Sequence, residues 1–342
     1  MAPRAPPSRD IERPVTARIL VCDDISEVGL EQLFRDGFEV HRRPGIRAEE
    51  LIRRAAGYDA LLVRSRTAVD AKLLSAAPRL RLLGRAGFGP GRIELQAATQ
   101  SGVVVLHSPE GNAVTAAEYA IAMIFNLARH IPAADASLRA GRWDKRRYRG
   151  IELRGKRLGV IGMGRVGRCV VERARALSMD VLVHDPLVTE DEVLSVGGRV
   201  AGWDELLSTS DFVTVHVSAT KATRGLIGEE AFHRMKDRVR IVNCSVRGVV
   251  DEKALLHALR TGKVAGAAID VFDEEPPLGN PLLEMSQVIA TPHLLASTFE
   301  AQIEVARSLA AQVSHFFKTG EVQEPVNPEV LNRLRGTFAS EG

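Results

Sequence analysis

Short apolar runs with the character of β-strands alternate with helix-like runs along almost the whole chain. In the first third, the pattern predicts strands at residues 18–23, 38–40, 60–63, 80–83 and 103–106, with helices at 27–35, 48–55, 71–76 and 95–99 between them. Such alternation is typical of βαβ units, in which a helix connects two parallel strands. The chain is therefore predicted to be an α/β protein built on parallel sheets.

A second series of the same kind follows a long apolar helix predicted at residues 113–130. Its strands are expected at 158–161, 181–184, 212–216, 240–243, 267–271 and 288–290, and its helices at 165–177, 204–207, 229–235 and 251–260. A last helix at 297–317 is expected to pack back on the first series. The length of 342 residues suits two domains. We predict two doubly wound parallel-sheet domains with a cleft between them.

The composition excludes several classes of protein. Hydrophobic residues make up 45% of the chain and charged residues 26%, as in ordinary globular proteins. The net charge of +3 is too small to indicate a nucleic-acid partner. The three cysteines, Cys22, Cys169 and Cys244, lie far apart and have the spacing of neither a metal site nor a disulfide framework. No metal is therefore predicted, and a reducing, cytoplasmic location is expected.

Neither the N-terminal segment nor the most apolar run of the chain predicts a membrane anchor. Residues 1–16 are rich in proline and lack an apolar core, so they are expected to form a disordered leader. The most apolar run, at 113–131, contains Glu118, Arg129 and His130. These charged residues interrupt it before the roughly 20 apolar residues that a membrane span needs. A buried helix is the better interpretation, and no membrane partner is expected.

The segment 162–167 has the pattern G-x-G-x-x-G between a predicted strand and a predicted helix. Gly162 would make the tight turn, Gly164 would let the backbone approach a pyrophosphate, and Gly167 would let helix and strand pack closely. Asp185 ends the next strand, where an acid accepts hydrogen bonds from the adenosine ribose and repels a 2′-phosphate. The segment predicts a Rossmann site for NAD rather than NADP. The alternative is a glycine-rich turn without a ligand.

A second glycine-rich run, at residues 84–91, also follows a predicted strand. Pro90 interrupts the approach to a helix, and Arg92 stands where the third glycine would be needed. This run is expected to be a loop that lines a substrate site, or a purely structural turn.

Two titratable residues follow predicted strands near the end of the second series. His293 comes just after the strand at 288–290, and Glu275 follows the strand at 267–271. Ligands of open α/β sheets bind beyond the carboxyl ends of the strands. A carboxylate beside an imidazole fixes its tautomer and stabilises its protonated form, which suits proton transfer near neutral pH. Their spacing in the sequence does not pair them, and a structural histidine is the alternative.

Seven stretches together resemble the D-isomer-specific 2-hydroxyacid dehydrogenases, and especially the short-type D-3-phosphoglycerate dehydrogenases. They are LLVRSRT (61–67), GRAGFG (84–89), GNAVTAAE (111–118), ELRGKRLGVIGMGRVGR (152–168), VDEKALLHAL (250–259), GAAIDVFDEEPP (266–277) and TPHLLAST (291–298). The resemblance extends from about residue 18 to 317. It implies a flavodoxin-like substrate domain at 17–110 and 296–324, and a Rossmann NAD domain at 111–295. Residues 325–342 would form a tail.

The resemblance also implies roles for individual residues. His293 and Glu275 match the family's acid–base pair. NAD would bind at the following residues: Gly162, Gly164, Arg165, Val166, Gly167, Asp185, His216, Val217, Ser218, Cys244, Ser245, Val246 and Asp270. Asp270 would lie near the nicotinamide carboxamide. The substrate would bind at the following residues: Arg64, Ser65, Arg85, Ala86, Gly87, Phe88 and Asn112.

The chain departs from the family where the third catalytic residue, an arginine, is expected. The alignment puts Val246 at that position, and Arg247 stands one place later, where the family has glycine. Neighbouring residues of an extended segment point to opposite sides, so Arg247 replaces the missing arginine only if the loop follows another path. Leu295 stands at another family glycine and is expected to crowd the nicotinamide. Ser218 replaces a family proline.

These observations predict an NAD-dependent 2-hydroxyacid dehydrogenase that transfers hydride between nicotinamide and C2 of a small acid, with or without a phosphate group. His293, Glu275 and Arg247 form its predicted catalytic set. Val246 and Leu295 keep two alternatives open: an NAD-binding sensor or scaffold with little turnover, or an enzyme for an unusual acid such as a phosphonate or a biosynthetic intermediate.

A homodimer is expected from the apolar run at 113–131, whose Ile121, Met123, Ile124 and Phe125 exceed the needs of one monomer core. The basic segment 139–149 is either a solvated loop or an anion site.

Overall fold

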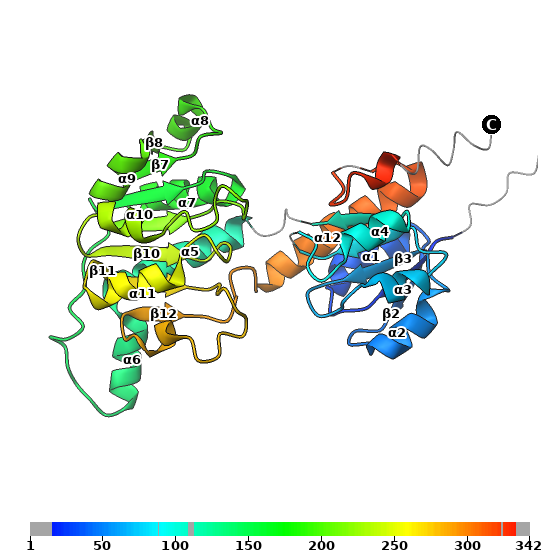
Figure 1. The fold of residues 1–342 in the computed structure, drawn as a ribbon, viewed down its shortest axis with the longest axis horizontal. Coiled ribbons are helices and arrows are strands. Elements are labelled where there is room, and N and C mark those ends of the chain that lie inside the picture. The colour runs from blue at the N-terminus through cyan, green and yellow to red at the C-terminus, as the bar shows by residue number, and fades with distance from the viewer. Residues whose placement is uncertain (1–15, 88, 109–112, 323, 333–342) are drawn as a thin grey trace, which may run out of the picture. The chain divides into compact units, whose positions relative to one another are not determined.

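The computed structural model describes residues 16–87, 89–108, 113–322 and 324–332 (Figure 1). The chain divides into two compact units. Unit 1 comprises residues 1–111 and 299–342, and unit 2 comprises residues 112–298. From the sequence, the first part of the substrate domain was expected to end at residue 110 and its second part to begin at residue 296. All but the last residue of the predicted leader, 1–16, lies outside the described residues.

Unit 1 is built on a five-stranded parallel sheet in the order β2-β1-β3-β4-β5. Its elements are β1 Arg18–Val21, α1 Glu27–Arg35, β2 Glu39–Arg42, α2 Ala48–Ala55, β3 Ala60–Val63, α3 Ala71–Ser75, β4 Leu82–Arg85, α4 Leu95–Gln100 and β5 Val104–His107. This order is that of the flavodoxin-like doubly wound fold. The predicted fold class of this domain is confirmed.

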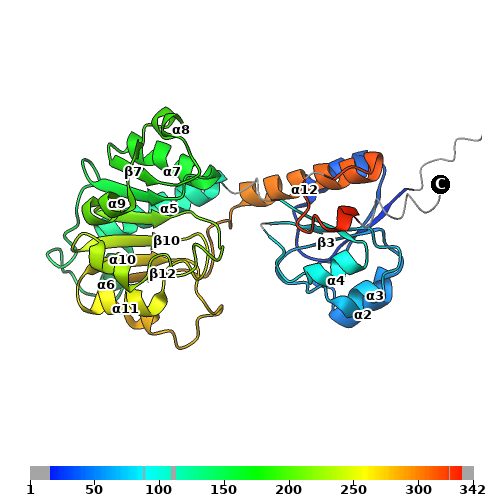
Figure 2. The same ribbon diagram turned by 45° about the horizontal axis from the view of Figure 1, so that its top comes forward.

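Both faces of the unit 1 sheet are covered, because consecutive residues of a strand point to opposite sides. Ile19 and Val21 of β1 pack with residues of α1 and of the C-terminal helix α12 (Phe299–Thr319). Leu20, between them, packs with residues of α2, α3 and α4. Figure 2 shows α12 on one side of this sheet and the three short helices on the other.

Helix α12 returns from the end of the chain to pack beside α1, as the sequence predicted. Gly29 allows the close approach, because a Cβ at this position would collide with the Cβ of Ala306. The contact ends at Asp36, which accepts hydrogen bonds from the Ser314 hydroxyl and from Gln32 and forms an ion pair with Lys318 at 2.6 Å. Bonds from Lys318, Ser314 and Gln32 lower the pKa of Asp36 to about 2.

We expect Asp36→Asn to lower the melting temperature at neutral pH and to flatten its dependence on pH. The folded-state pKa lies below the value of about 4 of an unfolded aspartate, so the carboxylate stabilises the fold fully above that pH. This contribution is lost as the pH falls towards 2. Thermal unfolding followed by circular dichroism from pH 7 to pH 2 measures both effects. Glu49→Gln, at an exposed site on α2, is the control.

The segment after α12 differs from the predicted tail at 325–342. The side chain of Asn327 accepts a hydrogen bond from Val105 N at 2.9 Å and donates one to Val103 O at 3.0 Å. Val330 has no exposed surface. This part of the segment therefore completes the core of unit 1 beside β5, and residues 333–342 lie outside the described part.

Unit 2 contains a seven-stranded parallel sheet in the order β12-β11-β10-β9-β6-β7-β8. The strands are β6 Arg157–Ile161, β7 Asp180–His184, β8 Arg199–Val200, β9 Phe212–Val215, β10 Val239–Asn243, β11 Val264–Ile269 and β12 Val288–Ala290. From β8 to β11, the order is that of the Rossmann fold, 3-2-1-4-5-6, so the predicted fold of this domain is confirmed.

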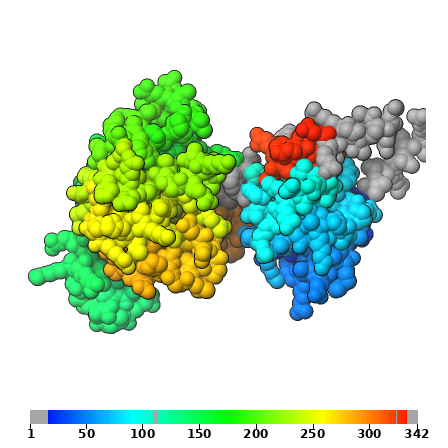
Figure 3. Space-filling model, viewed as in Figure 1, coloured from blue at the N-terminus to red at the C-terminus, as the bar shows by residue number. Residues whose placement is uncertain are grey.

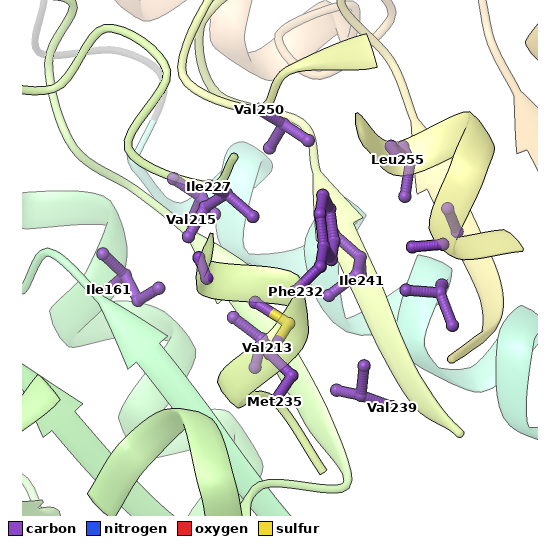
Figure 4. Close-up of a cluster of buried hydrophobic side chains, with 14 of the residues drawn as sticks. Ile161, Val213, Val215, Ile227, Phe232, Met235, Val239, Ile241, Val250 and Leu255 are labelled. Atoms are coloured by element: carbon purple, nitrogen blue, oxygen red, sulfur yellow. The ribbon is translucent and has the colours of Figure 1, made fainter. Parts of the chain in front are cut away.

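Unit 2 contains seven described α-helices, most of which lie on the two faces of its sheet. They are α5 Ala113–Arg129, α6 Ile131–Arg139, α7 Arg165–Ala176, α8 Glu190–Ser195, α9 Trp203–Thr209, α10 Glu229–Arg234 and α11 Glu252–Arg260. Helices α5 and α7 pack on one face. On the other face, Figure 4 shows Phe232 of α10 beside Ile241 of β10. The sequence did not predict α6, α8 or the short strand β8.

Helix α6 and the residues after it project from the body of unit 2 (Figures 1 and 3). The projecting segment exposes apolar surface, with 53% of Ile131, 55% of Leu138 and 75% of Trp143 accessible. Met123 and Ile124 of α5, in contrast, are buried in the core of unit 2. Among the described residues, no helix combines the length and the apolarity that a membrane span requires.

Candidate active site

Asp270 follows β11 and anchors the loop that carries His293. It has no exposed surface. Its carboxylate accepts hydrogen bonds from the Thr291 hydroxyl at 2.6 Å, from the backbone N of Leu294 and Leu295 at 2.8 Å each, and from the Tyr119 hydroxyl at 3.2 Å. A buried carboxylate needs such partners. Asp270, predicted to lie near nicotinamide, thus holds the neighbouring loop in place.

The structure brings His293 and Glu275 together. His293 Nδ1 lies 3.1 Å from Glu275 Oε2, and about half of the histidine side chain is exposed. The backbone of His293 is left-handed, with φ of 55°, and its N–H donates to the carbonyl oxygens of Asp270 and Thr291 at 3.0 Å. This turn directs the imidazole towards Glu275. Nδ1 therefore carries the proton in the pair, which leaves Nε2 available for exchange with a ligand.

Glu275 is kept charged by its neighbours. Burial alone would raise its pKa, but hydrogen bonds from His293 and from Phe272 N, with the charges of His293 and Arg247, lower the pKa below its usual range. The Phe272 N–H donates to Oε1 at 3.3 Å. A charged Glu275 fixes the tautomer of His293.

Arg247, and not Val246, lies beside this pair. Arg247 Nη2 is 3.9 Å from Glu275 Oε2, and 61% of its side chain is exposed. Val246 is half-buried and packs against the hydrophobic cluster of α10 and β10. Gly248 follows with φ of 76°, a left-handed conformation that redirects the chain after Arg247. The side chains of Val246 and Arg247 point to different sides of the segment, as expected. The side chain that faces Glu275 is that of Arg247.

Glu252, to which the sequence analysis assigned no role, holds the other end of the Glu275 loop. Its carboxylate accepts hydrogen bonds from Asp273 N at 2.7 Å and from the Asn280 side-chain amide at 2.7 Å. Glu252 opens α11, and so connects this helix to the loop that carries Glu275. Its position inside the VDEKALLHAL stretch was the only indication of a role that the sequence offered. The residues that it bonds lie more than twenty positions away in sequence.

The glycine turn of unit 2 has the geometry that a dinucleotide requires. It joins β6 to α7. Gly162 has φ of 89°, and a Cβ on Gly167 would collide with the carbonyl of Gly162. A Cβ on Gly164 would meet no atom within 4 Å, so this side of the turn is open to a ligand. Helix α7, which has twelve residues, begins at Arg165. The N-terminus of such a helix favours the binding of an anion.

Asp185 lies against the same turn. Its carboxylate accepts hydrogen bonds from Met163 N at 2.7 Å and from Leu187 N at 2.9 Å. A carboxylate has about four lone-pair sites, so the side chain can still accept bonds from ribose hydroxyls. The turn and Asp185 together fit NAD, because the carboxylate of Asp185 would repel a 2′-phosphate.

Comparison with known proteins agrees with this geometry. Residues 121–294 match the family model of the D-isomer specific 2-hydroxyacid dehydrogenase, NAD binding domain. The chain belongs to this family. The match covers the glycine turn, Asp185, Glu275 and His293, so the NAD-binding domain predicted from the sequence is confirmed.

Curated relatives of this chain are named D-3-phosphoglycerate dehydrogenase. That of Archaeoglobus fulgidus is 46% identical over 311 residues, which are 91% of this chain and 59% of the relative. The human protein is 39% identical over 314 residues, 92% of this chain and 59% of the relative. The chain therefore spans about three-fifths of the length of these relatives.

Solved structures match over nearly their full length. The pyruvate reductase of Chlamydomonas reinhardtii is 26% identical with a TM-score of 0.82, over 91% of this chain and 99% of that structure. An NAD-dependent formate dehydrogenase of Staphylococcus aureus, solved with NAD, is 25% identical with a TM-score of 0.75, over 90% of this chain and 97% of that structure.

The other residues predicted to bind NAD follow β9 and β10, next to the glycine turn. A Cβ on Gly162 would approach Val217 and the backbone of His216 within 3 Å. Burial lowers the pKa of His216 to about 4, so its ring is neutral and pairs with the Thr214 hydroxyl at 2.9 Å. Ser245 donates to Val217 O at 3.4 Å, and this bond ties the two strand ends together.

Two of the residues predicted to lie at the NAD site, Cys244 and Leu295, have side chains that pack with the hydrophobic core of unit 2. Cys244 is buried among residues of α5 and β6, and this burial raises the pKa of its thiol. Only its backbone could meet a cofactor. Leu295 packs against the same hydrophobic cluster, so its side chain is held by the core of unit 2. The expected crowding of nicotinamide by Leu295 stays a prediction.

All of the residues predicted to bind substrate except Asn112 lie in unit 1. Asp23, which is buried, accepts hydrogen bonds from Arg64 N at 2.6 Å and from the Thr67 hydroxyl at 2.8 Å, and so shapes the Arg64–Ser65 turn. Burial and, to a smaller extent, the charge of Arg64 lower the pKa of Arg85. Ala86 is buried, Gly87 has φ of 139°, and Phe88 and Asn112 lie outside the described residues.

Proposed function

We propose that this chain is an NAD-dependent 2-hydroxyacid dehydrogenase with His293, Glu275 and Arg247 as its catalytic residues. The observation that carries the proposal is the His293–Glu275 pair at 3.1 Å, whose two loops are anchored by Asp270 and Glu252. Anchoring from both sides preorganises the pair for proton transfer. The names of the relatives support an oxidoreductase of small hydroxy acids.

In this proposal, His293 Nε2 takes the hydroxyl proton of a 2-hydroxy acid or returns it to a 2-keto acid. Glu275 stabilises the resulting imidazolium, because its lowered pKa keeps it ionised. Arg247, at 3.9 Å from Glu275, binds the substrate carboxylate through its planar donors.

The glycine turn and Asp185 would hold NAD. Bound NAD supplies the hydride acceptor, and NADH the hydride donor, which no side chain of the chain can provide. The chain contributes the binding surface: the open side of Gly164, the N-terminus of α7 and the Asp185 carboxylate.

A screen of 2-keto acids tests the function. The full chain is incubated with NADH and each of a panel of acids, with and without phosphate groups, and NADH oxidation is followed. Turnover of at least one acid, lost in His293→Asn, supports the proposal. An NAD-binding sensor with little turnover is the alternative that Val246 favours. Tight NADH binding without turnover of any acid would favour it.

We expect NADH to bind more than about tenfold more tightly than NADPH. A 2′-phosphate would lie beside the Asp185 carboxylate, which the Met163 N–H holds in place. Like charges side by side cost several kcal/mol, and about 1.4 kcal/mol corresponds to a tenfold change in affinity. Fluorescence titration of the wild type and Asp185→Ala measures the ratio. The ratio should fall in the variant, and equal affinities in the wild type would contradict the assignment.

We also propose that the chain forms a homodimer through α6 and the residues after it. The exposed Ile131, Leu138 and Trp143 of this projecting segment support an interface. Light scattering at micromolar concentration is expected to give a dimer, and Leu138→Glu with Trp143→Ala to give a monomer. A wild-type monomer would contradict the proposal. The three free thiols support a reducing location such as the cytoplasm.

A further inference from the structure

An open pocket of about 360 Å³ lies in unit 2, beside the acid–base pair. Its walls are the loop 219–224, which follows β9, and the segment 247–249, which follows β10. Three of the lining side chains are cationic, namely Lys221, Arg224 and Arg247. No lining residue is acidic. No function has been assigned to this pocket above. One of its lining residues, Arg247, also belongs to the candidate active site.

The two walls are joined by backbone hydrogen bonds. Gly225 N donates to Gly248 O at 2.7 Å, and Ile227 N donates to Val249 O at 3.0 Å. The loop is braced from within, because Thr220 and Thr223 each donate a backbone N–H to the hydroxyl of the other, at 2.8 and 3.2 Å. The Thr223 hydroxyl donates to Ser218 O at 2.6 Å. The pocket is therefore preformed, and its cations are not brought together only when a ligand binds.

Two of the three cations that line the pocket, Lys221 and Arg224, have no acidic partner among the described residues. Within the described residues, neither Lys221 nor Arg224 forms an ion pair, and Arg247 meets Glu275 only at 3.9 Å. Other cations of this unit do have close acid partners: Arg199 lies 2.8 Å from Glu205, and Lys236 lies 2.9 Å from Asp211. An anion in this pocket would meet two cations that have no acidic partner in the part of the chain that the structure describes.

We propose that this pocket binds a phosphate group. A phosphate brings about two negative charges and several acceptor oxygens, which match the forked donors of Arg224 and the point charge of Lys221. The phosphate is either free inorganic phosphate or the phosphate end of an acid that reaches His293. The proposal goes beyond the dehydrogenase function and its first test needs no turnover.

The first test measures the binding of inorganic phosphate to the full chain by calorimetry, at an ionic strength held constant with sodium chloride because exposed charges are screened. Lys221→Ala and Arg224→Ala are each expected to weaken binding about 3- to 10-fold, and the double variant at least about tenfold. Arg260→Ala removes an exposed cation at the far end of α11 and should leave binding unchanged. Equal binding by the double variant and the wild type would overturn the proposal.

The second test identifies the source of the phosphate. The KM of a phosphorylated three-carbon 2-hydroxy acid is compared with that of its unphosphorylated analogue, in the wild type and in the Lys221→Ala/Arg224→Ala variant. If the substrate provides the phosphate, the variant raises KM for the phosphorylated acid alone, and inorganic phosphate competes with that acid. If free phosphate is the ligand, it binds without competing, and the variant leaves both KM values unchanged. A variant that raises both KM values equally would argue against a phosphate site.

Discussion

Replacing His293 with asparagine is expected to lower turnover by about 10²–10⁴-fold and to leave NADH affinity nearly unchanged. Asparagine has no group that gains and loses a proton near neutral pH, so the substrate hydroxyl loses its exchange partner. The glycine turn that binds NAD lies on β6 and α7, and His293 lies after β12. Steady-state kinetics on the acid found in the screen and fluorescence titration of NADH measure the two effects.

Two further variants control for indirect effects. His233→Asn changes an exposed histidine of α10 and should leave turnover unchanged. Glu275→Gln removes the charged acceptor that fixes the tautomer of His293, so turnover should fall while NADH affinity stays nearly unchanged. Full activity in His293→Asn would show that another group exchanges the proton.

Arg247→Ala is expected to reduce kcat/KM by about 10- to 100-fold. A hydrogen bond to a charged group contributes about 1.5–3 kcal/mol, and 1.4 kcal/mol corresponds to a factor of ten. The 61% exposure of Arg247 favours the lower part of this range, because water screens an exposed charge. Kinetics with the 2-keto acid that reacts best in the wild type measures the loss.

The neighbouring residue supplies the matched control. Val246 packs against the hydrophobic cluster of α10 and β10, so Val246→Ala should lower stability and leave kcat/KM almost unchanged. Arg247→Lys should recover only part of the activity, because an ammonium lacks the planar fork. If Arg247→Ala has wild-type kcat/KM, the carboxylate is bound elsewhere.

Much of the fold and part of the site could be predicted from the sequence. Strand-like and helix-like runs in alternation indicated two parallel sheets, because burial on both faces leaves each strand apolar over its whole length. The turn of Gly162, Gly164 and Gly167 with Asp185 could be located because its chemistry lies in a short segment with a fixed spacing. His293 and Glu275 were recognisable as candidates by residue type and by their positions after strands.

Only the tertiary structure showed how these residues meet. The His293–Glu275 contact depends on Asp270 and Glu252, whose hydrogen bonds join segments about twenty or more residues apart. The choice between Val246 and Arg247 depends on which side chain the core of unit 2 accepts. Likewise, Asn327 joins β5 more than two hundred residues away, where the sequence indicated a tail. The periodicity of apolar residues indicates which side of a helix or strand is buried. The direction of a side chain in a loop depends instead on contacts with residues that are distant in sequence.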